Sequence, residues 1–295
     1  MGRKINNLDK SSGVFKCRHP AHKSFGYAIS PYHALSLKKC YPRGCVEFLW
    51  RCRMFEKGQP CPRDFKHVGR GCFSCKHYHE EKIAYAPEIS LDDSQARYFI
   101  DDYREYQGWL DDMDGKTIEF SGVIESVKPH LAIEIEARRS NVNLDGYYAS
   151  FLSGYINNDL FDDKIYLRLS GTQLDRLNPA PDDSLDCETI FTHSRGRIIL
   201  QRARKINLSH NGGQRKINRS RALVGRATGA IIEGSLLPCK GCQYCSMADI
   251  TDMTRLRIVF YRRFFCLRGV SDPENCPVRL EEILRKEESS PDSAE

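Results

Sequence analysis

The chain has 295 residues, 45 Lys and Arg against 39 Asp and Glu, a net charge of +6, and 13 cysteines. This length can bury one large core or two to three small ones. No apolar run approaches the roughly 18 residues that span a bilayer, and no secretory leader is recognisable at the start. We therefore expect a soluble, cytoplasmic protein without a membrane partner, whose cysteines bind metal instead of forming disulfides.

Charge is distributed unevenly along the chain. Residues 1–85 carry 17 basic against 6 acidic side chains, residues 86–188 carry 9 against 22, and residues 189–295 carry 19 against 11. Two basic segments thus flank an acidic middle. Basic segments favour polyanionic partners, and nucleic acid is the first such partner to consider.

Residues 1–85 form a predicted metal-binding module, with seven cysteines, six histidines, frequent turn residues and little hydrophobic periodicity. Burial alone would not fold such a segment, whereas metal binding supplies folding free energy. We expect two sets of four ligands for zinc or a second iron-sulfur cluster. The first set is Cys52, Cys61, Cys72 and Cys75, which ends in a C-x2-C pair. The second set is Cys17, Cys40 and Cys45 with His22, or with His19 in its place.

A redox dithiol is the alternative interpretation of Cys72 and Cys75. The sequence around them lacks the strand-to-helix context that a thioredoxin-like motif needs. Metal ligation is therefore the favoured role of this pair.

Residues 86–114 are predicted to form an acidic connector helix. A capping box from Ser90 to Asp93 marks its start. Four apolar residues then fall on one helix face: Phe99, Tyr103, Tyr106 and Leu110. Such an aromatic stripe is typical of packing, and the acidic face opposite offers a contact surface for a protein partner.

Between residues 115 and 208 apolar and polar residues alternate, which predicts strands. The predicted strands are Ile118–Ile124, Leu131–Ala137, Tyr147–Ile156, Ile165–Leu169, Leu185–Thr192 and Ile198–Ile206, with a helix at Thr172–Leu177. This order resembles an OB-fold, a small Greek-key barrel, with Leu131–Ala137 beyond the minimum of five strands. A different closed sheet is the alternative. The predicted fold class is mainly β with small α parts, an OB-like Greek-key barrel flanked by two cysteine-rich metal-binding modules.

One predicted strand carries both charge and an aromatic ring. Lys164, Tyr166 and Arg168 should point away from the Ile/Leu face of Ile165–Leu169. OB barrels bind single strands through aromatic platforms and a positive groove, so these three residues are predicted to contact nucleic acid. Tyr147, Phe151 and Tyr155 share one side of the preceding strand, either as a stacking surface or as barrel core.

Residues 189–232 contain no Asp or Glu and ten Lys or Arg, eight of them Arg. A stretch of one sign repels itself unless a polyanion, or the acidic middle of the same chain, neutralises it. Guanidinium groups suit phosphate oxygens. The predicted nucleic-acid contacts are Arg195, Arg197, Arg202, Arg204, Lys205, Arg215, Lys216, Arg219, Arg221 and Arg226.

Residues 209–286 are the predicted basic stretch and C-terminal cysteine module, followed by a disordered tail at 287–295. Cys239, Cys242 and Cys245 follow the C-x2-C-x2-C pattern of ferredoxin-type runs, which predicts a 4Fe-4S cluster. Cys276, which precedes a proline, is the favoured fourth ligand, and Cys266 is the reserve. Zinc is the competing metal, although it usually takes two C-x2-C pairs.

The aromatic, arginine-rich run 255–268 adjoins this site and would either place positive charge beside it or extend the nucleic-acid surface. A last helix is predicted at Val278–Lys286. Cys187, alone on a predicted strand, is expected in the core.

No catalytic constellation is recognisable, since the sequence lacks a P-loop, a G-x-G-x-x-G after a strand, H-E-x-x-H and a zinc-deaminase signature. We therefore predict a metal-cluster-containing protein, more a binding protein than an enzyme, that binds single-stranded DNA or RNA. An iron-sulfur redox or electron-transfer protein is the alternative.

Overall fold

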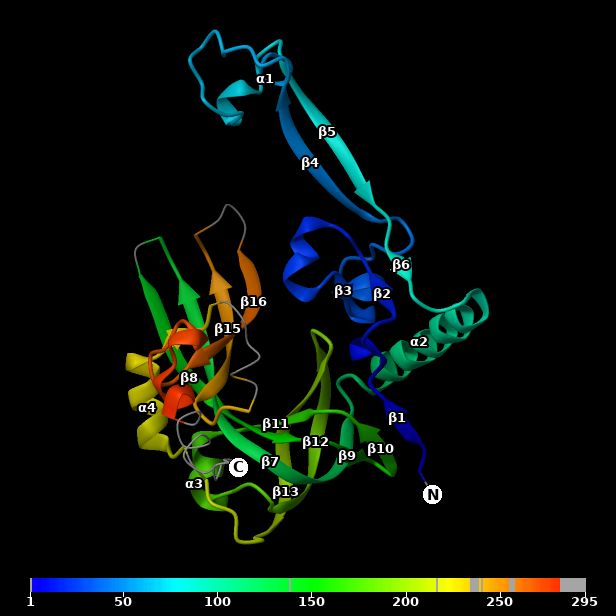
Figure 1. Ribbon diagram of the computed structural model, residues 1–295. Coiled ribbons are helices and arrows are strands. Elements are labelled where there is room, and N and C mark those ends of the chain that lie inside the picture. Colours follow the sequence, from blue (N-terminus) through cyan, green and yellow to red (C-terminus); the bar gives the residue numbers. More distant parts are fainter. Residues whose placement is uncertain are drawn as a thin grey trace, which may run out of the picture. The chain divides into compact units, whose positions relative to one another are not determined.

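The chain folds into two compact units in this computed structural model, and the fold is mainly β (Figure 1). The structure describes residues 2–137, 139–215, 217–233, 239, 241–254 and 258–281. The N-terminal unit is Asn7–Asp112, and the ring unit combines Met1–Asn6 with Met113–Glu295. Among the helices so described, none is long and apolar enough to cross a bilayer.

The N-terminal unit contains a small sheet, a long hairpin and a long helix. The sheet has the order β3 (Ala28–Ile29), β2 (Phe15–Lys16), β6 (Glu88–Ile89). The antiparallel hairpin is β4 (Cys45–Cys52) and β5 (Tyr78–Tyr85), with α1 (Arg53–Glu56) at its tip (Figure 1). Short helical turns are η1 (Leu8–Lys10), η2 (Pro20–Phe25), η3 (Tyr32–Leu37) and η4 (Arg70–Cys72). A small buried cluster of this unit consists of Val14, Phe15, Cys17, Ile29, Ala34 and Cys40.

The long helix α2 (Asp93–Met113) confirms the predicted apolar stripe, because Tyr103, Tyr106 and Leu110 are buried. The Tyr103 hydroxyl also donates to the buried Asp9 at 2.8 Å. The predicted cap at Ser90 is wrong. Asp92 caps the helix, since its Oδ1 accepts from the Gln95 N–H at 2.8 Å.

The ring unit is named for five strands that, among the described residues, pair in a closed circle. Around the ring they are β7 (Thr117–Ile135), β8 (Ser140–Phe151), β11 (Ile165–Leu169), β13 (Arg197–Ser209) and β12 (Ser184–Ser194). The pair β11–β13 is parallel and the other pairs are antiparallel. Helix α3 (Gly171–Leu177) connects β11 to β12. Large buried side chains fill the unit, among them Phe120, Phe151, Phe191, Leu167 and Leu200.

Strand β7 corrects two predicted boundaries. The segments predicted as Ile118–Ile124 and Leu131–Ala137 belong to one strand, which ends at Ile135. Its pairing with β8 shifts register between Ile124 and Ser126 and again between Pro129 and Leu131. Such bulges interrupt the alternation of period two, so one bent strand has the sequence pattern of two. Conversely, the predicted strand Tyr147–Ile156 divides into the end of β8 and β9 (Gly154–Ile156).

Two further sets of strands attach to the ring. β1 (Lys4–Asn6) pairs in parallel with β10 (Asp159–Asp162), and β10 leads through β9 to β7. On the other side, β15 (Cys245–Asp252) pairs in parallel with the second half of β7 and forms a hairpin with β16 (Val259–Cys266). Helix α4 (Arg219–Thr228) and β14 (Ala230–Ile231) precede this hairpin, and η6 (Pro273–Asn275) follows it. The cysteine module is thereby attached to the ring.

Several predictions lie outside the described residues. These are Lys216, the arginines at 255 and 257, the greater part of the predicted last helix, and the tail from 287 onward.

Candidate metal centres and nucleic-acid interface

All 13 cysteines are described, all are free thiols, and twelve of them gather in three groups. The N-terminal cluster is Cys17, His22, His33, Cys40 and Cys45. The hairpin-tip cluster is Cys52, Cys61, Cys72 and Cys75. The C-terminal cluster is Cys239, Cys242, Cys245, Cys266 and Cys276. The remaining thiol, Cys187, is buried on β12, as predicted for a core residue.

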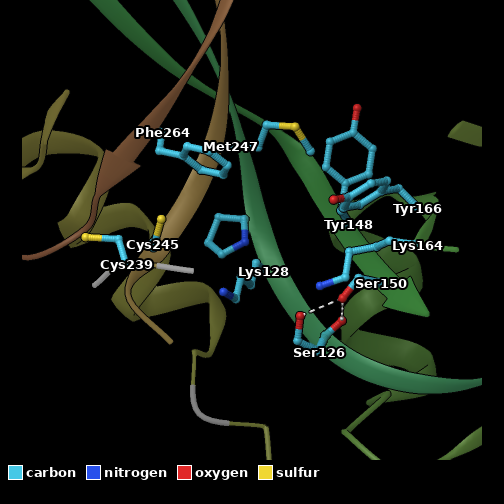
Figure 2. A pocket seen from close by; sticks show the side chains of 11 residues that line it. Ser126, Lys128, Tyr148, Ser150, Lys164, Tyr166, Cys239, Cys245, Met247 and Phe264 are labelled. Carbon is cyan, nitrogen blue, oxygen red and sulfur yellow. Dashed lines mark hydrogen bonds between the residues drawn. The ribbon is translucent and has the colours of Figure 1, made fainter. Parts of the chain in front are cut away.

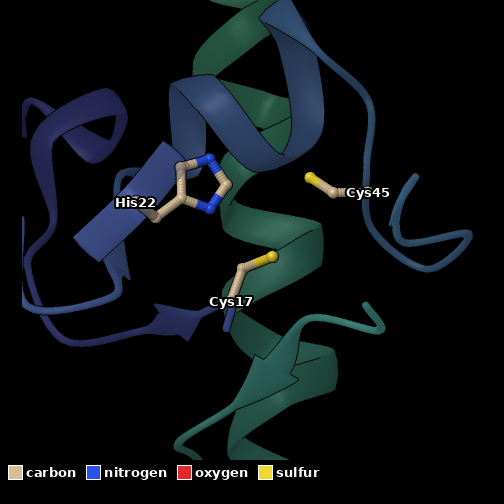
Figure 3. Close-up of side chains that lie close together, drawn as sticks. All are labelled: Cys17, His22 and Cys45. Carbon is tan, nitrogen blue, oxygen red and sulfur yellow. The ribbon is translucent and has the colours of Figure 1, made fainter. Parts of the chain in front are cut away.

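The N-terminal cluster can bind a metal ion. Cys17, His22 and Cys45 each place a ligand atom within 4.8 Å of the others, and so do His33, Cys40 and Cys45. Figure 3 shows the sulfurs of Cys17 and Cys45 and the His22 ring gathered around one point. Cys45 belongs to both groups because it begins β4 at the junction of hairpin and core. Of the predicted set, Cys17, His22 and Cys45 lie together, whereas Cys40 lies with Cys45 and His33 in the second group.

Two histidine nitrogens in this cluster are candidate ligand atoms in addition to the three thiols. His22 Nδ1 and His33 Nε2 are buried and have no hydrogen-bond partner among the described residues. Burial lowers the pKa of His33, and the charges of His22 and Lys38 add to this effect. A neutral imidazole with an unpartnered buried nitrogen is the form that binds metal. His19, the alternative ligand, instead caps η2, because its Nδ1 accepts from the Ala21 N–H at 3.2 Å.

His33 was missed by the sequence prediction. It lies in η3, a π-helical turn, seven residues before Cys40. This spacing matches no usual ligand pair. Its placement depends on how η3 packs against the start of β4, which local patterns do not encode.

The hairpin-tip cluster surrounds a cavity of about 10 Å³. Cys52 ends β4, and the other three cysteines lie on the loop that leads to β5. Tight turns shape this loop: the Asp64 N–H donates to the Cys61 carbonyl at 3.0 Å, and the Cys75 N–H donates to the Cys72 carbonyl at 2.8 Å. A cavity of this size holds about one water-sized sphere.

The C-terminal cluster gathers around the start of the β15–β16 hairpin. Cys245 and Cys266 lie directly opposite each other on the two strands. Burial raises the pKa of Cys239, and its neighbours Cys242, Cys276 and Cys266 raise it further. Five sulfurs thus lie in one neighbourhood, including both sequence candidates for the fourth ligand.

Lys128 of β7 places a positive charge beside this cluster. Its Nζ donates to the Cys242 carbonyl at 2.7 Å. Burial raises the pKa of the Cys245 thiol to about 12, whereas Lys128 acts in the opposite direction. Metal binding must displace such thiol protons, and a nearby ammonium group favours the resulting thiolates.

A cavity of about 230 Å³ lies between this cluster and the outer face of the ring (Figure 2). One side of the cavity is formed by residues that the strand pairing places next to one another. Lys128, Tyr148 and Arg168 form one row across β7, β8 and β11, and Ser126, Ser150 and Tyr166 form the next. The cavity is lined by Ser126, Lys128, Pro129, Tyr148, Ser150, Lys164, Tyr166, Cys239, Cys245, Met247 and Phe264.

The predicted orientation of β11 is confirmed. Ile165, Leu167 and Leu169 are fully buried, whereas the residues between them are partly exposed. Tyr166 lies on the outer face, with the Tyr148 ring centroid 5.8 Å away and the Arg197 guanidinium 5.8 Å from its own centroid. On β8, by contrast, Tyr147 and Phe151 are core, and they leave Tyr155 as the exposed ring of the three considered.

Some of the predicted nucleic-acid contacts pair with carboxylates of the chain. Lys164 pairs with Glu125 at 2.7 Å, Arg168 with Asp145 at 2.6 Å, and Arg219 with Asp175 at 2.9 Å. Lys205 pairs with Glu188. Partial exposure leaves such pairs weak, so a phosphate can compete for these cations.

The other basic residues differ in exposure. Five are exposed on β13, on α4 and in the turn before β13: Arg195, Arg202, Arg204, Arg221 and Arg226. Arg215 is half-buried and donates to the Leu174 carbonyl at 3.4 Å. Arg197 is half-buried against Tyr166. Among the described residues, the predicted set therefore includes both exposed and half-buried side chains on β11, β13 and α4 and in the segments beside them.

Comparison with known proteins adds no assignment, since no protein-family model, curated protein or solved structure matches the chain.

Proposed function

We propose that the chain is a metal-containing protein that binds single-stranded DNA or RNA on an OB-fold. The strand arrangement supports this proposal. The ring order β7-β8-β11-β13-β12 resembles that of a five-stranded Greek-key barrel, and α3 lies between β11 and β12, the third and fourth of these strands in chain order. OB-folds bind oligonucleotides on the face of their second and third strands, which are β8 and β11 here.

The observation that carries the proposal is the composition of this outer face. Tyr166 lies between Lys164 and Arg168 on β11, with Arg197 over its ring and Tyr148 beside it. Aromatic rings that stack on bases, surrounded by cations that contact phosphates, are how proteins bind single strands. The adjoining cavity, about 230 Å³, offers room for a base against Tyr166.

We propose that zinc occupies the two clusters of the N-terminal unit. Three thiols and an imidazole, or four thiols, are usual zinc ligand sets. Mutual distances within 4.8 Å at the N-terminal cluster, and a cavity of about 10 Å³ at the hairpin tip, support single ions. The role is structural, because the small core of this unit needs additional folding free energy.

For the C-terminal cluster we propose a 4Fe-4S cluster held by Cys239, Cys242 and Cys245 with Cys276 as fourth ligand. The C-x2-C-x2-C spacing supports iron-sulfur ligation. Lys128 would offset the negative charge of the thiolates. Absorption and electron paramagnetic resonance spectra of anaerobically purified protein test this assignment. A colourless protein that contains zinc and no iron would contradict it.

The binding proposal is tested by fluorescence anisotropy with labelled single-stranded DNA and RNA of about 15 nucleotides, within the range that one OB-fold contacts. We expect the dissociation constant to rise with salt concentration, since phosphate contacts release counterions. Replacing Tyr166 by Ala should weaken binding by about 1–3 kcal/mol, the usual contribution of one stacked base.

The matched control is Tyr166→Phe, which keeps the ring and should bind nearly as the native protein does. Loss of affinity in both variants would indicate a role of the hydroxyl and not of stacking. No binding of either strand, in protein that contains its metals, would refute the proposed function. Redox activity without nucleic-acid binding would favour the electron-transfer alternative.

A further inference from the structure

Four arginines surround a second cavity on the ring unit, with a volume of about 190 Å³. Arg195 lies in the turn between β12 and β13, Arg197 begins β13, and Arg262 and Arg263 are neighbours on β16. The apolar part of the lining is Ile232, Met247 and Phe264. Residues more than sixty positions apart in the sequence therefore meet around one space.

The charges around this cavity do not balance. Asp249 is the carboxylate that pairs with the group, at 2.6 Å and 3.2 Å from two nitrogens of Arg262. Burial would raise the pKa of Asp249, but hydrogen bonds from His130 and Arg262 outweigh it and lower the pKa. Its negative charge is shared with His130, at 3.1 Å. Among the described residues no other carboxylate forms an ion pair with the four arginines, and the guanidinium of Arg263 lies 5.8 Å from the centroid of the Tyr261 ring.

Two of the arginines are poorly solvated. The Arg262 side chain is only 12% exposed, and its Nη1 is buried without a hydrogen-bond partner among the described residues. Arg197 contacts the Tyr166 ring and the Met247 sulfur, and the structure pairs it with no carboxylate in the described part of the chain. A buried donor without an acceptor, beside a second arginine that has no carboxylate partner and next to a cavity, indicates that an anion supplies the acceptors.

Phosphate is the anion that this group fits. Guanidinium forks donate two parallel hydrogen bonds to phosphate oxygens, and arginine is favoured wherever such recognition occurs. A phosphomonoester carries nearly two negative charges and three non-bridging oxygens, whereas an internal phosphodiester carries one charge. The excess of arginine over carboxylate around this cavity therefore favours the monoester.

The cavity adjoins the proposed base-binding face. Met247 and Phe264 line both cavities. Arg197, which lines the cavity with the four arginines, also lies over the ring of Tyr166, which lines the other cavity. A nucleotide whose base stacks on Tyr166 would therefore have its phosphate within reach of the arginines.

We propose that the cavity lined by Arg195, Arg197, Arg262 and Arg263 binds the terminal phosphate of a nucleic-acid strand, so that the protein recognises phosphorylated strand ends. This inference rests on the proposed function and names its substrate class.

The test compares anisotropy titrations of one single-strand sequence with a phosphate or a hydroxyl at the 5′ end, and likewise at the 3′ end. We expect one phosphorylated end to bind about tenfold or more tighter than its hydroxyl counterpart, as charge-assisted hydrogen bonds would provide. Arg197→Gln should reduce this ratio towards one. Arg195→Gln, at an exposed rim position, should reduce it less.

Arg204→Gln is the matched control, because Arg204 is exposed on the same strand as Arg197 but lies outside the cavity. It should weaken both strands equally and leave the ratio unchanged. Circular dichroism of each variant confirms the fold, and the Arg195 variant maintains the test if the Arg197 variant does not fold.

Each outcome is decisive. Equal affinity for phosphate and hydroxyl at both ends of a strand that binds would overturn the inference and leave the proposed function standing. If no strand binds, the proposed function fails, and adenosine monophosphate is titrated against adenosine. If the monophosphate binds and adenosine does not, the phosphate site is supported and recognition of a nucleic-acid strand is refuted. If neither compound binds, both the phosphate site and the proposed function are refuted.

Discussion

Replacing Cys45 by Ser should unfold the N-terminal unit while the ring unit stays folded. Cys45 is the ligand common to both groups of the N-terminal cluster. One substitution therefore removes a ligand from whichever of the two histidine sets the metal uses. The affected unit is Asn7–Asp112.

The expected magnitude follows from the core of that unit. The large buried apolar side chains of the unit are Val14, Phe15 and Ile29 of the small cluster and Tyr103, Tyr106 and Leu110 of α2, and two further buried residues, Cys17 and Cys40, are proposed ligands. Full burial of an apolar side chain contributes about 1.5–3 kcal/mol, so these six supply about 9–18 kcal/mol, which the conformational entropy lost on folding largely offsets. A structural zinc site contributes about 10–16 kcal/mol. Since domains are stable by only about 5–15 kcal/mol, loss of the metal exceeds the margin.

The assay combines metal analysis with limited proteolysis of the full chain. Cys45→Ser protein should lose one zinc ion per chain, and mass spectrometry should locate the new cleavage sites within residues 7–112. Cys187→Ala is the control, because Cys187 is a buried thiol outside all three clusters. It should keep every metal ion and lose only about 1 kcal/mol of stability.

A Cys45→Ser protein that keeps its zinc content and its protease resistance would refute the reasoning. It would mean that apolar burial and the remaining side chains suffice to fold this unit. Equal metal loss in the Cys187→Ala control would refute it too, since the effect would then not depend on ligation.

Three further predictions test other parts of the account. Asp183 is buried, and although burial alone would raise its pKa, hydrogen bonds from Asn211, Ala180 and His210 lower the pKa below the ordinary 3.8. The ionised form therefore stabilises the fold above that pH. The melting temperature should fall as the pH drops below about 4, and it should fall less in Asp183→Asn. Asp92→Ala should cost about 1 kcal/mol in chemical denaturation, because it removes the α2 cap. Cys72→Ser should release one zinc ion and expose only the loop between β4 and β5 to protease.

The sequence predicted those features that depend on local pattern. Alternation identified the buried and outward faces of β11, and helical spacing identified the stripe of Tyr103 and Tyr106 on α2. Cysteine spacing identified neighbours within the hairpin-tip and C-terminal clusters, because C-x2-C pairs lie on tight turns whose geometry is set by a few residues.

Features that depend on pairing between distant segments were not predictable in this way. The parallel pairing of β15 with β7 brings Met247 beside His130, and no local pattern encodes that contact. The same holds for β1, which joins the ring unit through β10 from the other end of the sequence.

The adjacent residues Tyr147 and Tyr148 show a limit of a different kind. Both are buried, but Tyr147 fills the core while Tyr148 lies in the outer-face row with Lys128 and Arg168. In a strand, a shift of one residue exchanges the two faces. The sequence alone does not decide which tyrosine lies on which face, and so the second ring of the proposed binding surface was missed.

The most direct test of the central claim is photo-crosslinking of a single-stranded oligonucleotide to the metal-containing protein, followed by mass spectrometry of the crosslinked peptides. We expect crosslinks on β8 and β11, at Tyr148 and Tyr166, which disappear when unlabelled strand is added in excess. Crosslinks confined to residues 7–112, or none above the level seen with duplex, would contradict the claim that the outer face of the ring binds single strands.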